Sequence, residues 1–239
     1  MKQFFCFLFI LSAAVLPASA DPANVVYWDF FATASPATNT FSGLNVSDLS
    51  RGNNNNGPTA TINDSSSSSG YTTADGFAAS GGTNAVASAT PGTLDISAST
   101  YFATDLSLDS LSPFSLALNE ISLGARTTST GPTSLVLYAS TDGFNSDFQS
   151  LGSISAPGSW TAVQFSGLSL AINPGDTLSL RLYGADGTGT SGIGNWRIDD
   201  LAIALTPTPE PSSISLAAAG FAVLIAWRFR QIKSRRSGA

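Results

Sequence analysis

Thr177–Tyr183 reads TLSLRLY, and this alternation of apolar and polar residues decides the fold. Successive side chains of an extended chain point to opposite faces, so Leu178, Leu180 and Leu182 share one face. The polar residues between them share the other face. A period of two predicts a β-strand with one face in a core and the other toward solvent.

Short runs of the same kind recur along the chain. Besides 177–183, the predicted strands cover residues 25–31, 94–106, 114–126, 134–140, 160–165 and 196–205. Pairs that favour turns, such as Gly131-Pro132 and Pro157-Gly158, stand between them. No helical period is sustained before residue 206. This pattern predicts an all-β domain over residues 21–205, an antiparallel β-sandwich or jelly roll.

The last predicted strand is irregular. Its apolar residues form two sets that are out of phase by one position: Trp196 and Ile198, then Leu201, Ile203 and Leu205. A β-bulge at Asp199-Asp200 would bring both sets to one face, because a bulge inserts one extra residue into a strand.

Residues 52–92 have a different composition. They include the run Asn53–Asn56, the run Ser65–Ser69 and several glycines. Such a segment is too polar to be buried, and we predict a long flexible loop.

The N-terminus has the pattern of a secretory signal peptide over residues 1–20. Lys2 precedes an apolar core, and Ala18-Ser19-Ala20 is an A-x-A cleavage site. We expect export through the Sec translocon and cleavage by signal peptidase between Ala20 and Asp21. The alternative is an uncleaved membrane helix, which Pro17 and the small residues after it disfavour.

The C-terminus has three parts. Residues 206–213 form a proline-rich linker, which we predict to be extended and accessible because proline fits neither a regular helix nor a central strand. The apolar run 214–227 predicts a short transmembrane helix, below the 17–25 residues of a full span. Residues 228–239 form a basic tail on the cytoplasmic side. Its basic residues are Arg228, Arg230, Lys233, Arg235 and Arg236.

This order of motif, apolar run and basic end resembles the PEP-CTERM sorting signal of Gram-negative bacteria. In that family a membrane-embedded transpeptidase, the exosortase, recognises the Pro-Glu-Pro element and removes the tail. The resemblance implies that Pro209, Glu210 and Pro211 are the recognition element. It also implies that the helix anchors the protein in the inner membrane only before processing. The alternative is a plain C-terminal anchor preceded by a linker.

Residues 121–203 carry a second resemblance. The run Ser122-Leu123-Gly124-Ala125-Arg126, the turn at Asp142-Gly143 and the run Trp196–Asp200 are similar to those of β-sandwich domains in secreted bacterial proteins. Similar closing strands occur in jelly-roll modules of the carbohydrate-binding type. The resemblance implies architecture and hints at a class of ligand.

Composition excludes several kinds of chemistry. The chain has no histidine, and its one cysteine, Cys6, lies in the predicted signal peptide. A mature domain would therefore lack disulfides, a Ser-His-Asp triad and zinc sites of the usual N/S kind. Residues 21–205 hold 4 basic and 15 acidic residues, so their net charge is 4 − 15 = −11. Such a surface repels nucleic acid and anionic polymers, and it would tolerate neutral glycans and divalent cations.

Five aspartates fall in predicted turns or at the predicted bulge: Asp142, Asp147, Asp186, Asp199 and Asp200. Oxygen ligands from such loops suit a structural calcium ion, and Asp199 is the best single candidate because a bulge re-aims side chains. The alternative is that these residues belong to ordinary turns. No other cofactor is expected.

Few other residues suggest a site. Trp28, Trp160 and Trp196 could stack on sugars, although Trp160 and Trp196 open strands with apolar partners and so favour core packing. A carboxylate glycosidase would need a second group besides Glu120, and none lies in an apolar context. Arg126 and Arg197 are either a substrate clamp or members of ion pairs.

The sequence therefore predicts an exported, non-catalytic protein of the cell surface or extracellular matrix, associated with exopolysaccharide. The alternatives are a carbohydrate-binding module and, after it, a glycosidase. No ligand-binding residue is assigned.

Overall fold

The computed structural model describes residues 25–30, 38–54, 71, 85–88, 92–189 and 194–209. The predicted signal peptide, the transmembrane helix 214–227 and the basic tail lie outside the described residues, as do Glu210 and Pro211. In the part of the chain that is described, no helix is long and apolar enough to cross a membrane.

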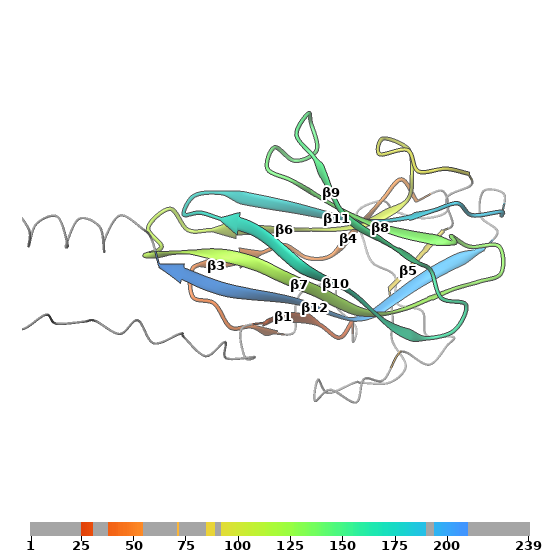
Figure 1. Cartoon of the computed structure of the whole chain (residues 1–239), viewed down its shortest axis with the longest axis horizontal. Coiled ribbons are helices and arrows are strands. Elements are labelled where there is room, and N and C mark those ends of the chain that lie inside the picture. The colour runs from red at the N-terminus through yellow and green to blue at the C-terminus, as the bar shows by residue number, and fades with distance from the viewer. Residues whose placement is uncertain are drawn as a thin grey trace, which may run out of the picture.

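The described residues form a β-sandwich of two antiparallel sheets (Figure 1). Sheet A has the order β10 (Thr161–Ile172), β7 (Phe114–Thr127), β12 (Asn195–Pro209), β1 (Val25–Trp28), β2 (Thr38–Asn39), with β5 (Ala85–Ser88) also paired to β12. Sheet B has the order β3 (Leu44–Val46), β6 (Tyr101–Leu108), β11 (Thr177–Ala185), β8 (Ser134–Ser140), β9 (Gln149–Ser155), with β4 (Ser50–Gly52) also paired to β6. The predicted all-β sandwich is confirmed.

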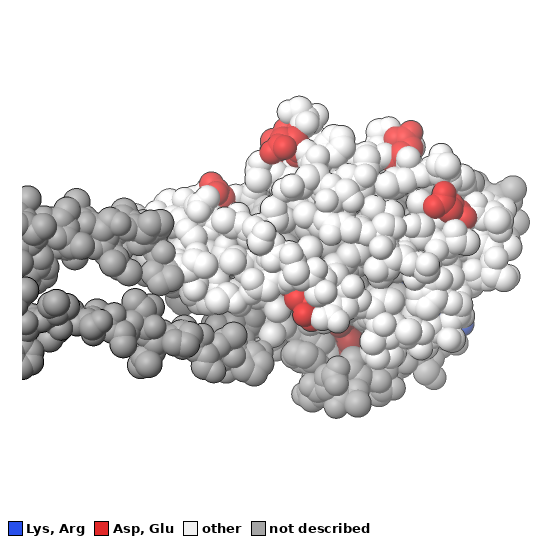
Figure 2. All heavy atoms as spheres, viewed as in Figure 1, with Lys and Arg blue, Asp and Glu red and all other residues white. Residues whose placement is uncertain are grey.

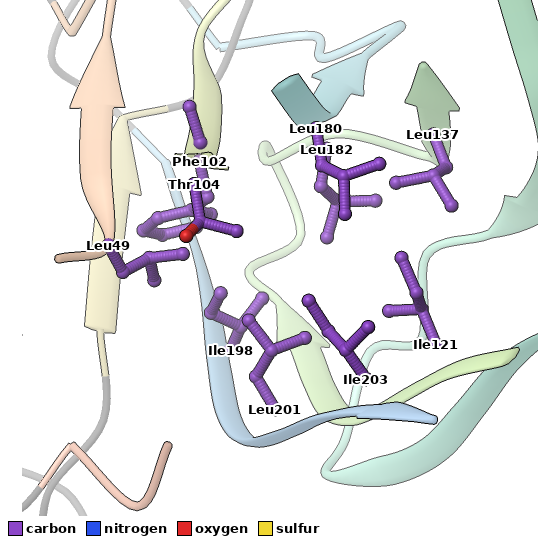
Figure 3. Close-up of a pocket in the computed structure, with 11 residues that line it drawn as sticks. Leu49, Phe102, Thr104, Ile121, Leu137, Leu180, Leu182, Ile198, Leu201 and Ile203 are labelled. Atoms are coloured by element: carbon purple, nitrogen blue, oxygen red, sulfur yellow. The ribbon is translucent and has the colours of Figure 1, made fainter. Parts of the chain in front are cut away.

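The core lies between the two sheets and is filled by their alternate apolar residues. Leu178, Leu180 and Leu182 are all buried, as the period of two predicted. Leu180 and Leu182 face Ile121 and Ile203 of sheet A around a void of about 30 Å³ (Figure 3). A void of this size leaves a closely packed interior, so the fold holds its outer faces as rigid platforms.

The predicted bulge in the last strand is confirmed. The pairing of β12 with β7 shifts register between Asp199 and Ala202, and Asp200 has a φ of 47°. Both apolar sets of the strand are consequently buried: Trp196, Ile198, Leu201, Ile203 and Leu205.

The predicted course of the chain needs correction at several points. The strand predicted over residues 94–106 begins only at Tyr101, because residues 94–100 are not in a strand. The segment 52–92 is not loop throughout, because Ala85–Ser88 pairs with β12 as strand β5. Strand β9 was not predicted, since its sequence, QSLGSIS, is polar and contains glycine. The linker 206–213 was predicted to begin outside the sheet, but β12 continues to Pro209 and pairs with β7 down to Phe114. Among the described residues, this end of β12 pairs with β7 alone, and proline is tolerated at such an edge.

Candidate functional site

Aromatic side chains form a row across the outer face of sheet B, the face turned away from the core. Tyr101, Tyr183 and Tyr138 come from the neighbouring strands β6, β11 and β8. The ring centroids of Tyr101 and Tyr183 are 5.2 Å apart, and those of Tyr183 and Tyr138 are 5.8 Å apart. These distances are typical of edge-to-face contacts, so three strands are joined by touching rings.

The alternation of β11 places this row. Its leucines enter the core, so Ser179, Arg181 and Tyr183 lie on the outer face. Tyr183 is nevertheless fully buried, and its hydroxyl donates a hydrogen bond to the carbonyl of Ile96 at 3.1 Å. Burial raises the pKa of Tyr183, and the nearby Arg181 partly opposes that rise.

The loop between β8 and β9 adds two more rings to this face. The rings of Phe144 and Phe148 are stacked with centroids 6.2 Å apart, and Phe148 also meets Tyr138 at 6.1 Å. Phe144 has a φ of 68°, a conformation that is unusual for a large side chain. Strained residues persist only where surrounding contacts hold them, so this loop has a defined shape.

Asp142 fixes that shape. Its carboxylate accepts hydrogen bonds from the backbone N–H groups of Asn145, Ser146 and Asp147 at 2.8–3.0 Å, and from the hydroxyls of Ser140 and Ser146. Desolvation pushes the pKa of Asp142 upward, but these donors outweigh it and hold the pKa well below its ordinary value. The carboxylate therefore stays ionised and keeps the loop closed.

Arg181 lies between the sheet and this loop. Its guanidinium carbon is 4.4 Å from the ring centroid of Tyr101 and 4.0 Å from that of Phe144. Cation–π contacts of this kind hold a guanidinium in one plane. The Nη1 group also donates to the Tyr183 hydroxyl at 3.3 Å.

A groove of about 210 Å³ opens beside Arg181 on the outer face of sheet B. Its lining combines the aromatic residues Tyr101 and Phe144, the charged residues Arg181 and Asp105, and the hydroxyl residues Ser50 and Ser179. The Tyr101 ring can pack closely against its register partner Gly52 only because glycine has no Cβ. A Cβ at Gly52 would come within 1.9 Å of the Tyr101 ring. The groove thus offers apolar ring surface beside several hydrogen-bonding groups.

This combination suits a polyhydroxylated ligand. Aromatic surface packs against the C–H face of a sugar ring, while hydroxyl, carboxylate and guanidinium groups bind its hydroxyls. Among the described residues that line the groove, Asp105 is the one acid. Glycoside hydrolysis generally uses two carboxyl groups on either side of the bond to be cut.

The predicted calcium ligand Asp199 lies elsewhere, on the outer face of sheet A. It is 2% exposed, and its carboxylate accepts hydrogen bonds from the backbone N–H groups of Tyr71 and Asp200 at 2.8 and 3.1 Å. Desolvation raises its pKa to about 7. No group of three or more acidic, histidine or cysteine ligands is found within the described residues. The calcium site stays a prediction.

The other acidic turn residues do not converge on Asp199. Asp142 and Asp147 belong to the loop after β8, and Asp186 follows β11. Asp200 accepts a hydrogen bond from the Tyr27 hydroxyl at 2.5 Å. Burial, and then Asp200, raises the pKa of Tyr27. These residues therefore belong to separate turns and to the bulge, with Asp142 closing its own loop.

The tryptophans do not form a sugar platform. Trp28 and Trp196 are 0% and 1% exposed. Core packing is therefore confirmed for Trp196, and Trp28 is not accessible for stacking on a sugar. Trp160 is half-buried outside the core, where its ring meets Tyr71 at 6.3 Å and Arg126 at 5.8 Å. Core packing was therefore the wrong prediction for Trp160.

The remaining candidates lie on sheet A. Arg126 and Arg197 are register partners on β7 and β12, and burial, followed by the charge of Arg126, lowers the pKa of Arg197. Glu120 pairs with Ala204 of β12 and Ser166 of β10. All three residues belong to the opposite sheet from the groove.

The predicted C-terminal recognition element begins inside the fold. Pro209 is the last residue of β12 and the register partner of Phe114. The family model described as the PEP-CTERM protein-sorting motif matches residues 207–231. The chain carries a PEP-CTERM sorting motif. The protein is therefore exported and is anchored through its C-terminal region before processing, and the motif implies an exosortase as its partner.

Comparison with solved structures finds β-sandwiches of low similarity. A family 11 carbohydrate-binding module from Clostridium thermocellum, in complex with a β-1,3-1,4-mixed-linked tetrasaccharide, is 14% identical with a TM-score of 0.36, over 75% of this chain and 94% of that one. A CBM22-1 xylan-binding domain from Paenibacillus barcinonensis is 12% identical with a TM-score of 0.37, over 70% and 87%. The C-terminal domain of a chitobiase from Bacteroides fragilis is 16% identical with a TM-score of 0.30, over 45% and 65%. At these values the likeness carries no argument about ligand or site. None of the curated proteins matches the chain.

Sequence reasoning missed the groove. Its members are scattered from Ser50 to Arg181, and the registers of β6 and β11 bring them together. One signal was present: Arg181 and Tyr183 occupy the polar side of TLSLRLY, where a cation and an aromatic share the outer face.

Proposed function

We propose that this exported protein is a non-catalytic component of the cell surface or extracellular matrix that binds exopolysaccharide through the groove beside Arg181. The observation that carries the proposal is the aromatic row from Tyr101 to Phe148, with Arg181 held between two of its rings. The polymer lies across the outer face of sheet B. Its sugar rings pack on Tyr101, Phe144 and Phe148, whose rings are at least partly exposed, and its hydroxyls bind Ser50, Asp105 and Ser179.

The charge of the domain supports a neutral or mixed polymer rather than nucleic acid. Residues 21–205 have a net charge of 4 − 15 = −11, which repels a polyanion of high charge density. The face seen in Figure 2 is largely uncharged, with isolated acidic residues and almost no basic ones. Such a surface lets an uncharged or sparsely charged chain approach.

Export through the Sec translocon and cleavage between Ala20 and Asp21 complete the proposal, as the sequence predicts. The exosortase then acts at Pro209, Glu210 and Pro211, with the basic residues from Arg228 to Arg236 on the cytoplasmic side. The protein ends at the cell surface or in the matrix, where its polymer lies.

Affinity electrophoresis of the full chain, solubilised in detergent, tests this function in gels that contain the secreted polysaccharide of the producing strain. We expect the polysaccharide to retard the wild type, and Tyr101→Ala or Phe144→Ala to weaken binding about tenfold, which is the scale of one lost aromatic contact. Tyr71→Ala is the matched control, because Tyr71 lies on the outer face of sheet A.

Two outcomes would contradict the proposal. Equal retardation of the Tyr101 and Tyr71 variants would place binding outside the groove, and no retardation of the wild type would favour a structural surface protein without a glycan ligand. Release of sugar from the polymer that is lost in Glu120→Gln would favour the glycosidase reading.

A further inference from the structure

Arg181 differs from the other arginines of the domain in how its charge is used. Arg51 is 4% exposed and donates from Nη1 to the carbonyl of Val86 at 2.7 Å. Arg126 lies over Trp160, and Arg197 stands beside Arg126 on sheet A. Arg181 lines the groove on the outer face of sheet B.

The guanidinium of Arg181 is fixed but largely unused. Its contacts in the described part of the chain are the rings of Tyr101 and Phe144 and one hydrogen bond to Tyr183. A guanidinium has five N–H donors, so most of them are available. Within the described residues no carboxylate lies near enough to form an ion pair with Arg181.

A half-buried cation that forms no ion pair with any described residue favours an anionic ligand. Burial removes water from the guanidinium. A carboxylate that accepts two parallel N–H hydrogen bonds from it replaces the lost hydrogen bonds and neutralises the charge. The two covering rings hold the guanidinium plane in advance, which lowers the entropy cost of such a two-point contact.

We infer that Arg181 binds the carboxylate of a uronic acid residue in the polysaccharide, which makes the ligand an acidic glycan. This inference rests on the proposed function and names the substrate class of the same groove. The hydroxyls on the rest of the sugar donate to Asp105, which lines the groove with Arg181. Asp105 also repels a second carboxylate, so the site takes one charged sugar at a time.

The charge of the domain fits a sparsely acidic polymer. The net charge of 4 − 15 = −11 over residues 21–205 opposes a dense polyanion, whereas a chain with spaced uronates offers its carboxylates singly. Binding should therefore be strongest for polymers in which uronates alternate with neutral sugars.

The test compares matched polymers with the full chain in detergent. Hyaluronan and desulfated chondroitin, in which uronates alternate with uncharged sugars, and the secreted polysaccharide of the strain are each used beside their carboxyl-reduced forms, which differ only in the carboxylate. We expect at least one acidic polymer to bind about tenfold or more tighter than its reduced form. Arg181→Gln should abolish that preference, and Arg181→Lys should keep part of it.

Asp105→Asn provides a control with the opposite sign. Removing this carboxylate should strengthen binding of the acidic polymer, because the repulsion between the two carboxylates is lost. Binding of the carboxyl-reduced polymer should stay unchanged or become weaker. A merely structural role for Arg181 would not produce these opposite responses. Thermal unfolding of each variant shows whether the fold is kept.

The outcomes separate the two proposals. If the reduced polymers bind as tightly as the acidic ones, or if the preference survives Arg181→Gln, the uronate inference is wrong while glycan binding stands. If no polymer binds in either form, both proposals are wrong.

Discussion

Single residues on the two outer faces have opposite electrostatic roles. Asp142 collects five donors and stays ionised, so it orders a loop beside the groove. Asp199 is buried with two backbone donors, and desolvation dominates its energetics. An aspartate thus closes a loop at position 142, where its pKa is lowered, and has a pKa that burial raises at position 199.

Asp199 makes the stability of the fold depend on pH. Its pKa is about 7 in the folded protein and 3.8 ordinarily, so between these values the folded state binds more protons than the unfolded state. The contribution of Asp199 to the free energy of unfolding is therefore full below pH 3.8 and is lost as the pH rises toward 7. At 1.36 kcal/mol per pKa unit, the loss is at most about 4 kcal/mol.

Asp199→Asn should remove this slope, because the amide keeps an acceptor for the N–H group of Tyr71 and cannot ionise. We expect urea unfolding between pH 4 and 7 to show a falling free energy of unfolding for the wild type and a flatter curve for the variant. Asp109→Asn, at an exposed site, serves as control. Identical slopes for the wild type and Asp199→Asn would contradict the assignment.

At the scale of elements, alternating sequences were predictable and polar ones were not. The leucines of β11 and the two apolar sets of β12 fixed their own faces, and their phase shift located the bulge at Asp199-Asp200. Strands β5 and β9 carry no such pattern, because their pairing is set by neighbours already in the sheet. The groove depends on the register of β6 with β11, which no local pattern contains.

The overlap of β12 with the sorting motif has a consequence for processing. Residues 207–209 belong to both, and Thr208 donates from its hydroxyl to the carbonyl of Ser115 at 3.2 Å. A transpeptidase that reads Pro209 as an extended peptide has to compete with β7 for the end of this strand.

A disulfide across this pairing should therefore slow processing. Ser115 and Thr208 are register partners, and the chain has no cysteine outside the predicted signal peptide. The intact mass of the Ser115→Cys/Thr208→Cys protein should show that the C-terminal tail is retained. Adding a reductant, which opens the disulfide, should restore removal of the tail. Ser107→Cys/Thr177→Cys staples two register partners of sheet B and is the matched control. Equal processing of both stapled proteins would show that β12 need not open.

At the scale of the whole molecule, we propose that the two ends of the chain determine its destination and that the sandwich determines what is bound there. The sorting motif could be read from the sequence because its three parts are contiguous. The groove could not, because sheet B assembles it from residues that are far apart in the chain. Delivery and binding are therefore separable, and variants of the groove should leave sorting intact.

The most direct test of the account is the fate of the protein in the producing cells. The fraction of processed protein in the extracellular matrix and in the medium is measured for the wild type and for Tyr101→Ala/Phe144→Ala. We predict that both proteins lose their tails, that the wild type stays in the matrix, and that the double variant escapes into the medium. Retention of the double variant in the matrix at the wild-type level would contradict the claim that the groove holds the protein to its polysaccharide.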